Sequence, residues 1–228
     1  IRKDTKSKAN LLLDLGINTN LAPVADTPYS KSDYIYYRTF STSAKKNSKY
    51  IKTVIKEMGK NNLVSTLKHF PGYGNNGDTH SQIIRDKRKL STFKSRDLLP
   101  FKAGIKAGAD MIMVSHNIVD AFDKKHPASL SKKVHKYIRN EMNYDGVIIT
   151  DGLGMNGVVD FVGGDKGEAA IKSVLAGNDM LCANNYKIQY PAVLKAVKDG
   201  KIKEKQIDES VKRILILKLN RKIIKWNK

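Results

Sequence analysis

The segment 107–116, AGADMIMVSH, combines a glycine, four consecutive apolar residues and a histidine two positions beyond them. Two further phrases resemble its opening: AGND at 176–179 and NYDG at 143–146 each lead into another apolar run. Glycine commonly ends helices because it adopts the left-handed backbone conformation at little cost. These joints therefore predict a fold in which helices and strands alternate along the chain.

The wider sequence repeats this pattern. Each apolar run has four to eight residues and is mostly apolar on both faces, which is typical of parallel strands covered on both sides. The five runs are Thr19–Val24, Leu63–Phe70, Asp110–His116, Gly146–Asp151 and Asp179–Ala183. Apolar residues recur at helical spacing between and after them, within 51–58, 98–105, 134–138, 170–175, 193–197 and 207–219. A closed (β/α) barrel needs eight strands, so five strands predict either an open sheet or part of a barrel.

The composition is strongly basic, with 42 Lys and Arg against 22 Asp and Glu and a net charge of +20. Such a surface attracts nucleic acid, anionic lipid or anionic cell-wall polymer. The lysines are spread over the whole chain and no nucleic-acid-binding motif accompanies them, so we favour a generally lysine-rich surface and predict no nucleic-acid partner. No apolar stretch approaches the ~20 residues of a membrane helix, so we predict no membrane insertion. The single cysteine, Cys182, excludes an internal disulfide.

Polar residues lie at or just beyond the ends of four apolar runs. Asp26 follows the first run, Lys68 and His69 stand near the end of the second, His116 ends the third and Asp151 ends the fourth. In barrel enzymes the active site forms at this end of the strands. The pattern therefore predicts a catalytic rim.

The segment KHFPGYGNNGDTH (68–80) holds two histidines, a lysine and an aspartate among three glycines. The carboxylate of Asp78 can orient the imidazole of His80, an arrangement suited to proton transfer. A surface turn with incidental polar residues is the less favoured interpretation. A zinc site built from His69, Asp78, His80 and His116 is ranked lower still, because the spacing matches no metal motif; we predict no metal and no cofactor.

The segment DGVIITDGLGM (145–155) places Asp151 at the end of an apolar strand, directly before Gly152. A carboxylate there can act as a nucleophile or base. A helix N-cap is an equally good interpretation of Asp151 when this segment is taken alone.

Together these motifs resemble the bacterial β-N-acetylglucosaminidases (β-hexosaminidases) of glycoside hydrolase family 3. The 68–80 segment is similar to the family's K-H-F-P-G loop with its D-(S/T)-H, and GVIITDGLGM is similar to its strand ending in (S/T)-D-x-L-x-M. INTNLAPVAD (17–26) and YRTFS (37–41) resemble two further family elements. The resemblance covers essentially the whole chain and implies one incomplete TIM-type barrel domain over 1–228. It begins at the helix before the family's fourth strand, so the first three strands have no counterpart.

The resemblance also implies roles for individual residues. Asp151 matches the nucleophile, and His80 matches the general acid/base oriented by Asp78. Lys68 and His69 match a pair that hydrogen-bonds sugar hydroxyls, and Arg38 matches an arginine that contacts the sugar. Three more residues match positions assigned to the sugar pocket: Asp26, His116 and Met155. At helical spacing Met155 could equally belong to the core.

These roles imply a retaining exo-β-N-acetylglucosaminidase that forms a covalent glycosyl-aspartate on Asp151. The expected substrate carries terminal β-linked N-acetylglucosamine, as peptidoglycan fragments do, and the expected compartment is the bacterial cytoplasm or the cell surface. A histidine repels an anionic acceptor less than a carboxylate does, so a glycoside phosphorylase is an alternative. A non-catalytic carbohydrate- or cell-wall-binding protein derived from a truncated barrel is another. The missing strands would come from a longer protein or from a second chain. The family's acidic residues after the arginine are also absent from RTFSTSAKK (38–46).

Overall fold

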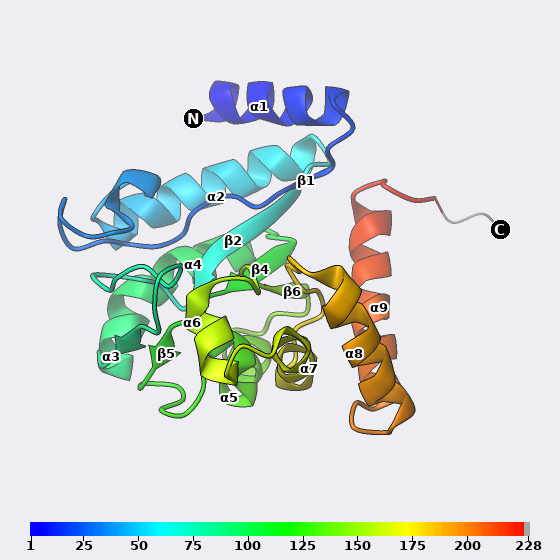
Figure 1. Cartoon of the computed structure of the whole chain (residues 1–228). Helices are drawn as coiled ribbons and strands as arrows, with labels where there is room; N and C mark the ends of the chain where they lie inside the picture. Colours follow the sequence, from blue (N-terminus) through cyan, green and yellow to red (C-terminus); the bar gives the residue numbers. More distant parts are fainter. Residues whose placement is uncertain (226–228) are drawn as a thin grey trace.

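The structure is a computed structural model of the chain and describes residues 1–225. Its α-helices are α1 (Arg2–Asp14), α2 (Ala44–Lys60), α3 (Leu90–Thr92), α4 (Leu98–Lys106), α5 (Lys132–Lys136), α6 (Asn156–Val159), α7 (Lys166–Ala176), α8 (Tyr186–Lys198) and α9 (Glu204–Asn220). Its strands are β1 (Thr19–Asn20), β2 (Val64–Phe70), β3 (Arg85–Asp86), β4 (Met111–Val114), β5 (Ile118–Val119) and β6 (Val147–Thr150). Short 3₁₀ or π turns are η1 (Tyr36–Arg38), η2 (Phe93–Asp97), η3 (Ala128–Leu130), η4 (Tyr137–Glu141) and η5 (Asp160–Val162). Figure 1 shows the arrangement of these elements.

The central sheet is parallel and open, with the strand order β1-β2-β4-β6. The predicted α/β fold of a partial barrel is confirmed. The fifth predicted strand, Asp179–Ala183, is reduced to a single bridge between Met180 and Ile149 of β6. The ladder stops there since the amide of Cys182 donates to the side-chain hydroxyl of Thr150 instead of to a backbone carbonyl. The small parallel pair β3–β5, which lies outside the central sheet, was not predicted.

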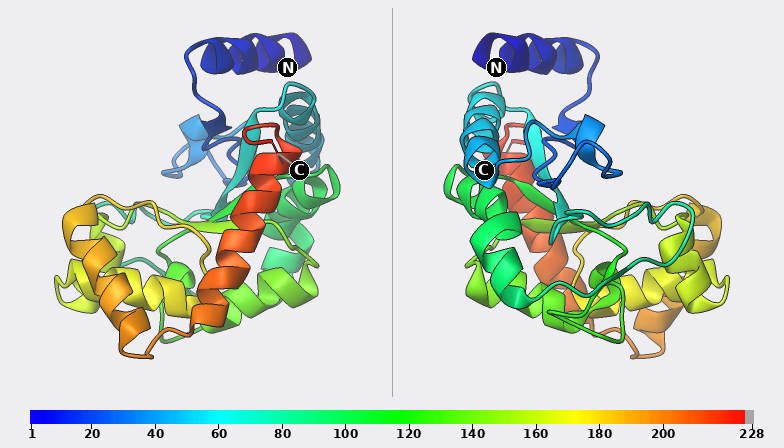
Figure 2. Two further views of the ribbon diagram at one scale, coloured as in Figure 1. Left: turned by 90° about the vertical axis from the view of Figure 1, so that its right-hand side faces the viewer. Right: turned by 90° about the vertical axis from the view of Figure 1, so that its left-hand side faces the viewer.

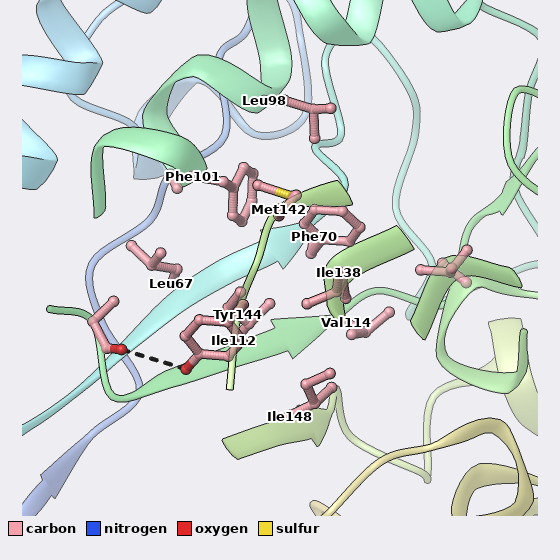
Figure 3. Close-up of a cluster of buried hydrophobic side chains, with 14 of the residues drawn as sticks. Leu67, Phe70, Leu98, Phe101, Ile112, Val114, Ile138, Met142, Tyr144 and Ile148 are labelled. Atoms are coloured by element: carbon pink, nitrogen blue, oxygen red, sulfur yellow. Dashed lines mark hydrogen bonds between the residues drawn. The ribbon is translucent and has the colours of Figure 1, made fainter. Parts of the chain in front are cut away.

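One face of the sheet packs against α2, α4 and the α5–η4 segment. Leu67, Ile112 and Ile148, from three neighbouring strands, belong to one buried cluster with Phe101 of α4 and Ile138 of η4. Figure 3 shows these side chains meeting above the strands. Burying aliphatic and aromatic side chains of this size contributes about 1.5–3 kcal/mol each, so this cluster is a main source of stability.

The other face packs against α9, which Figure 2 shows in orange and red alongside the sheet. Its Ile214 and Leu217 contact a second cluster that includes Val64 and Val147. Side chains alternate along a strand, so Lys68 of β2 and Asp151, just beyond β6, fall on this same side. The strand pattern thus directs the proposed nucleophile and the lysine to one face of the sheet.

The aspartates of the AGAD and AGND phrases tie the opposite end of the sheet together. Asp110 accepts hydrogen bonds from the amide of Ser65 (2.9 Å) and from Nε of Arg221 (2.7 Å), beyond α9. Asp179 is almost fully buried. Its carboxylate accepts from Arg139 Nη2 (2.6 Å), Ile148 N (2.9 Å), Arg213 Nη1 (3.0 Å) and Ser210 Oγ (3.0 Å). Both phrases therefore connect a strand start to its neighbouring strand and to the C-terminal part of the chain.

Two helix ends have clear local causes, and the end predicted at Gly177 is confirmed. The hydroxyl of Ser131 accepts a hydrogen bond from the amide of Val134 and caps the start of α5. Gly177 ends α7 in the left-handed conformation, with φ of 118°. Among residues 1–225, no helix is both long enough and apolar enough to cross a membrane.

Candidate active site

Asp26, beyond β1, organises the start of the 68–80 loop. Its carboxylate is fully buried and accepts hydrogen bonds from the backbone amide of His69 (3.0 Å), from Nδ1 of His69 (2.7 Å) and from the amide of Tyr73 (2.8 Å). Three bonds to a single carboxylate fix both the histidine ring and the turn that follows it. In this structure the carboxylate of Asp26 therefore positions His69 and Tyr73.

His69 in turn positions Arg38. Because Nδ1 of His69 donates to Asp26, its Nε2 is free to accept, and Nη2 of Arg38 lies 3.2 Å away. The other arginine nitrogen, Nη1, donates to the hydroxyl of Tyr34 (3.2 Å). The sequence motifs therefore do bring His69 and Arg38 together, and both His69 ring nitrogens are occupied.

Lys68 and Asp151 lie on the same side of the sheet, close enough for the carboxylate to influence the lysine. Burial lowers the pKa of Lys68, the charge of Arg38 lowers it further, and the carboxylate of Asp151 acts to raise it. Burial raises the pKa of Tyr73 and of Cys182. The proximity of Asp151 is a smaller cause that raises both pKa values further. Asp151 thus lies close to Lys68, Tyr73 and Cys182.

The turn after Asp151 decides between the two interpretations of this residue. Its Oδ1 accepts from the amide of Gly152 (2.8 Å), and its own amide donates to Val114 O (2.9 Å). The next helix, α6, begins five residues later, and its N-cap position is Met155. The helix N-cap interpretation is therefore wrong, and the half-buried carboxylate stays at the strand end.

His116 holds the turn after Asp151 through a hydrogen bond to Gly152. It is fully buried, and its Nε2 lies 3.0 Å from the carbonyl of Gly152 while its Nδ1 lies 2.7 Å from the hydroxyl of Ser129. A carbonyl only accepts, so Nε2 carries the proton and Nδ1 accepts from Ser129. Burial lowers the pKa of His116, which favours this neutral ring. Both nitrogens are used within the protein, so a direct contact of His116 with a sugar stays a prediction without support in this geometry.

Met155 is also buried and lies next to the same turn. A Cβ on Gly152 would sit 3.8 Å from the sulfur of Met155. The side chain therefore packs against the backbone that follows Asp151.

Asp78 and His80 form the expected pair. Nδ1 of His80 lies 2.6 Å from Oδ1 of Asp78, and the same oxygen accepts from the backbone amide of His80 (2.9 Å). Burial would raise the pKa of Asp78, but the hydrogen bonds from the amide and ring of His80 outweigh it, so the pKa lies below its ordinary value. The imidazole is 57% exposed, which leaves its Nε2 available for proton exchange.

The base of this loop is fixed by Arg88, which the sequence reading did not single out. Its guanidinium donates to Asp86, to Asp97 (2.9 Å) and to the carbonyl of Gly72 (2.9 Å). Burial raises the pKa of Asp97 to about 6, although Arg88 acts against this. A Cβ on Gly74 would lie only 2.1 Å from the guanidinium, so glycine is needed for the loop to fold over it.

Tyr34 is a second residue that the sequence reading missed. Its hydroxyl lies 3.4 Å from Nδ1 of His80 and accepts from Arg38, so it connects the arginine to the Asp78–His80 pair. No motif marks it in sequence, because it lies in an irregular segment 46 residues before His80.

Within the described residues, no group of three or more His, Cys, Asp or Glu lies close enough to hold a metal ion.

Comparison with known proteins places this chain in a family. Residues 1–217 match the glycosyl hydrolase family 3 N-terminal domain. The chain belongs to glycoside hydrolase family 3. It is 31% identical over 186 residues to a β-hexosaminidase of Methylococcus capsulatus and 34% identical over 184 residues to one of Idiomarina loihiensis. These alignments cover 81% and 80% of this chain but 55% and 54% of the relatives, so this family 3 chain spans about half their length.

Solved structures agree with this assignment. A family 3 β-N-acetylglucosaminidase from Paenibacillus superposes with a TM-score of 0.93 at 31% identity, covering all of this chain and 44% of that one. LpqI of M. tuberculosis superposes with a TM-score of 0.87 at 27% identity, covering 95% of this chain and 66% of that one. The open sheet described above therefore corresponds to part of the family 3 barrel domain.

Proposed function

We propose that this chain carries the catalytic site of a retaining exo-β-N-acetylglucosaminidase. The observation that supports it most is the Asp78–His80 hydrogen bond of 2.6 Å, in a chain whose β-hexosaminidase relatives are about 30% identical. A histidine held by a carboxylate through one nitrogen can carry a proton on the other. Asp151 supplies the carboxylate that a covalent intermediate needs.

The proposed reaction has two displacements. A carboxylate oxygen of Asp151 attacks the anomeric carbon of a terminal β-linked N-acetylglucosamine, and the bond to the leaving oxygen breaks as His80 protonates that oxygen. His80 then takes a proton from water, which attacks the same carbon and releases Asp151. Two inversions give net retention, with a histidine in place of the carboxylic acid of the usual retaining scheme.

The remaining site residues would bind and orient the sugar. Lys68, which lies near Asp151, and Arg38, which lies near Lys68, would bond the hydroxyls. His69 shares its Nε2 with Arg38, so we propose that His69 and Asp26 act on the sugar through the arginine. Peptidoglycan fragments are the proposed source of the substrate.

Release of 4-nitrophenol from 4-nitrophenyl β-N-acetylglucosaminide tests this function. The assay is run on this chain and on a protein of the relatives' length that contains it, each beside its Asp151→Ala variant. Turnover that Asp151→Ala abolishes is the expected result. If both proteins are folded and neither turns over, the glycosidase proposal fails and a carbohydrate-binding protein becomes the better explanation.

Phosphorolysis is a second candidate function, favoured by the charges around the site. The acid/base group is a histidine, and Lys68 has both Arg38 and Asp151 nearby, so an anionic acceptor would meet cationic side chains. Adding inorganic phosphate to the same assay and analysing the product separates the two. N-acetylglucosamine 1-phosphate would indicate a phosphorylase, and free sugar a hydrolase.

A further inference from the structure

The segment around Arg38 carries an exposed aromatic surface that the proposed reaction does not use. Tyr37 is 87% exposed and Phe40 is 50% exposed. They border a cavity of about 360 Å³. Its lining consists of Tyr36, Tyr37, Thr39, Phe40, Ser41 and Thr42.

Each exposed ring is supported by a second ring. Tyr37 meets Tyr36 edge-to-face, with centroids 5.2 Å apart and planes at 89°. Phe40 stacks on Tyr50 of α2, with centroids 4.5 Å apart and planes at 2°. Backing of this kind fixes the orientation of a ring before any ligand arrives, which lowers the entropic cost of binding.

The backbone that carries the rings is also anchored. Asn47 of α2 is buried and its Nδ2 donates to the carbonyls of Asp26 (3.1 Å) and Ser41 (2.7 Å), which ties the two ends of the segment together. Arg96 donates to the carbonyls of Thr27 (3.0 Å) and Thr42 (3.1 Å). The aromatic surface therefore lies on a loop whose backbone is fixed by hydrogen bonds from Asn47 and Arg96.

Along the chain this surface directly flanks Arg38, a residue of the proposed sugar site. Arg38 lies between Tyr37 and Thr39 in sequence, and its guanidinium reaches His69 and Tyr34. A ligand that leaves the Arg38 region toward the aromatic rings would stay in contact with the protein.

The lining indicates the chemistry of that ligand. In a chain of net charge +20, the cavity has only hydroxyl-bearing and aromatic side chains and no ionised one. An anionic polymer would find no partner there, and a neutral ligand would. β-linked N-acetylglucosamine holds its substituents equatorially, so each ring presents a face of C–H groups to an aromatic ring and a rim of polar groups to hydroxyls.

We propose that Tyr37 and Phe40 form a second sugar-binding surface for the rings of a β-linked N-acetylglucosamine chain beyond the terminal ring. This inference rests on the proposed function, because it places the terminal ring beside Arg38. It predicts a preference for chains over the single sugar.

Binding of the β-1,4-linked tetrasaccharide of N-acetylglucosamine tests the inference, measured by calorimetry in an Asp151→Asn background that prevents turnover. We expect Tyr37→Ala to weaken tetrasaccharide binding by about tenfold, the effect of losing one stacking ring. Tyr37→Phe keeps the ring and should bind as the background does. Tyr186→Ala removes another exposed tyrosine (68%) on α8 and serves as the matched control.

The outcomes separate this inference from the proposed function. Equal affinity in Tyr37→Ala and Tyr186→Ala, or no tetrasaccharide binding at all, overturns the sugar surface whatever the hydrolysis assay gives. Tyr37-dependent binding without nitrophenol release supports the surface and counts against the glycosidase. If Tyr37→Ala instead changes the sedimentation of the chain and leaves sugar binding unaltered, the surface joins two copies of the chain and the inference is wrong.

Discussion

At the scale of single residues, His116 couples the core to the turn after Asp151. Its Nε2–H bonds Gly152 O, and Ser129 holds the other nitrogen. His116→Phe removes the donor and should lower kcat for the nitrophenyl substrate by about a hundredfold, because the carboxylate is no longer held in place. His116→Gln keeps an N–H at a similar reach and should retain most of the rate. Equal rates in the two variants would contradict a positioning role.

Protonation is a second property of single residues. Burial lowers the pKa of both His116 and His135. Their folded pKa values lie below the unfolded value of about 6.5, so the unfolded chain binds more protons and stability is lost as the pH falls below that value. The free energy of unfolding should drop by about 1.4 kcal/mol per pH unit for each histidine. Urea titrations between pH 5 and 8 would measure this.

His135→Gln should flatten that dependence, whereas the same change at the exposed His126 should not. A slope equal in the wild type and in His135→Gln would mean that this histidine takes up its proton without unfolding.

At the scale of elements, the 68–80 loop is docked on α6. The amide of Asn156 donates to the carbonyl of His80 (3.3 Å), and that of Gly157 donates to the carbonyl of Thr79 (2.9 Å). A Cβ on Gly157 would lie 3.0 Å from Thr79 O and 3.1 Å from Thr79 Cβ. The loop can approach this closely only because residue 157 is glycine.

Gly157→Ala should therefore push the loop away and speed hydrogen exchange at the amides of 156 and 157. It should also lower kcat/KM for the nitrophenyl substrate, since His80 moves with the loop. Asn156→Ala keeps both backbone donors, loses only the long side-chain bond to Ser81 O (3.4 Å) and is the matched control. Unchanged exchange in Gly157→Ala would show that the loop adapts without loss of the contact.

At the scale of the whole molecule, Asp179 joins β6, η4 and α9 through one buried carboxylate. Asp179→Ala leaves Arg139 and Arg213 without their partner, and removing one member of a buried ion pair costs about 3–5 kcal/mol. Urea denaturation should detect that loss. Asp199→Ala breaks an exposed pair with Lys195 and should change stability by less than about 1 kcal/mol. A similar small change in both would remove Asp179 from the main determinants of stability.

The sequence by itself determined the alternation of strands and helices and which polar residues stand at the strand ends. Local periodicity reports this because neighbours two or four positions apart decide which face is apolar. The loop motif also indicated the Asp78–His80 pair, since two residues separated by one position meet whenever the loop turns tightly. The catalytic and sugar-binding roles of these residues stay predictions.

Only the tertiary structure decided how the site residues share their hydrogen bonds. Asp26 meets His69 across 43 positions, and Arg221 meets Asp110 across 111, distances over which no sequence pattern carries pairing information. His116 was expected near the sugar, yet packing turned both of its nitrogens toward protein groups. Tyr34 lies in the site although no motif marks it in sequence. The fifth predicted strand is a single bridge, because the amide of Cys182 donates to the hydroxyl of Thr150. Such outcomes depend on which groups remain unpaired once the strands and helices have packed, and packing is a property of the whole fold.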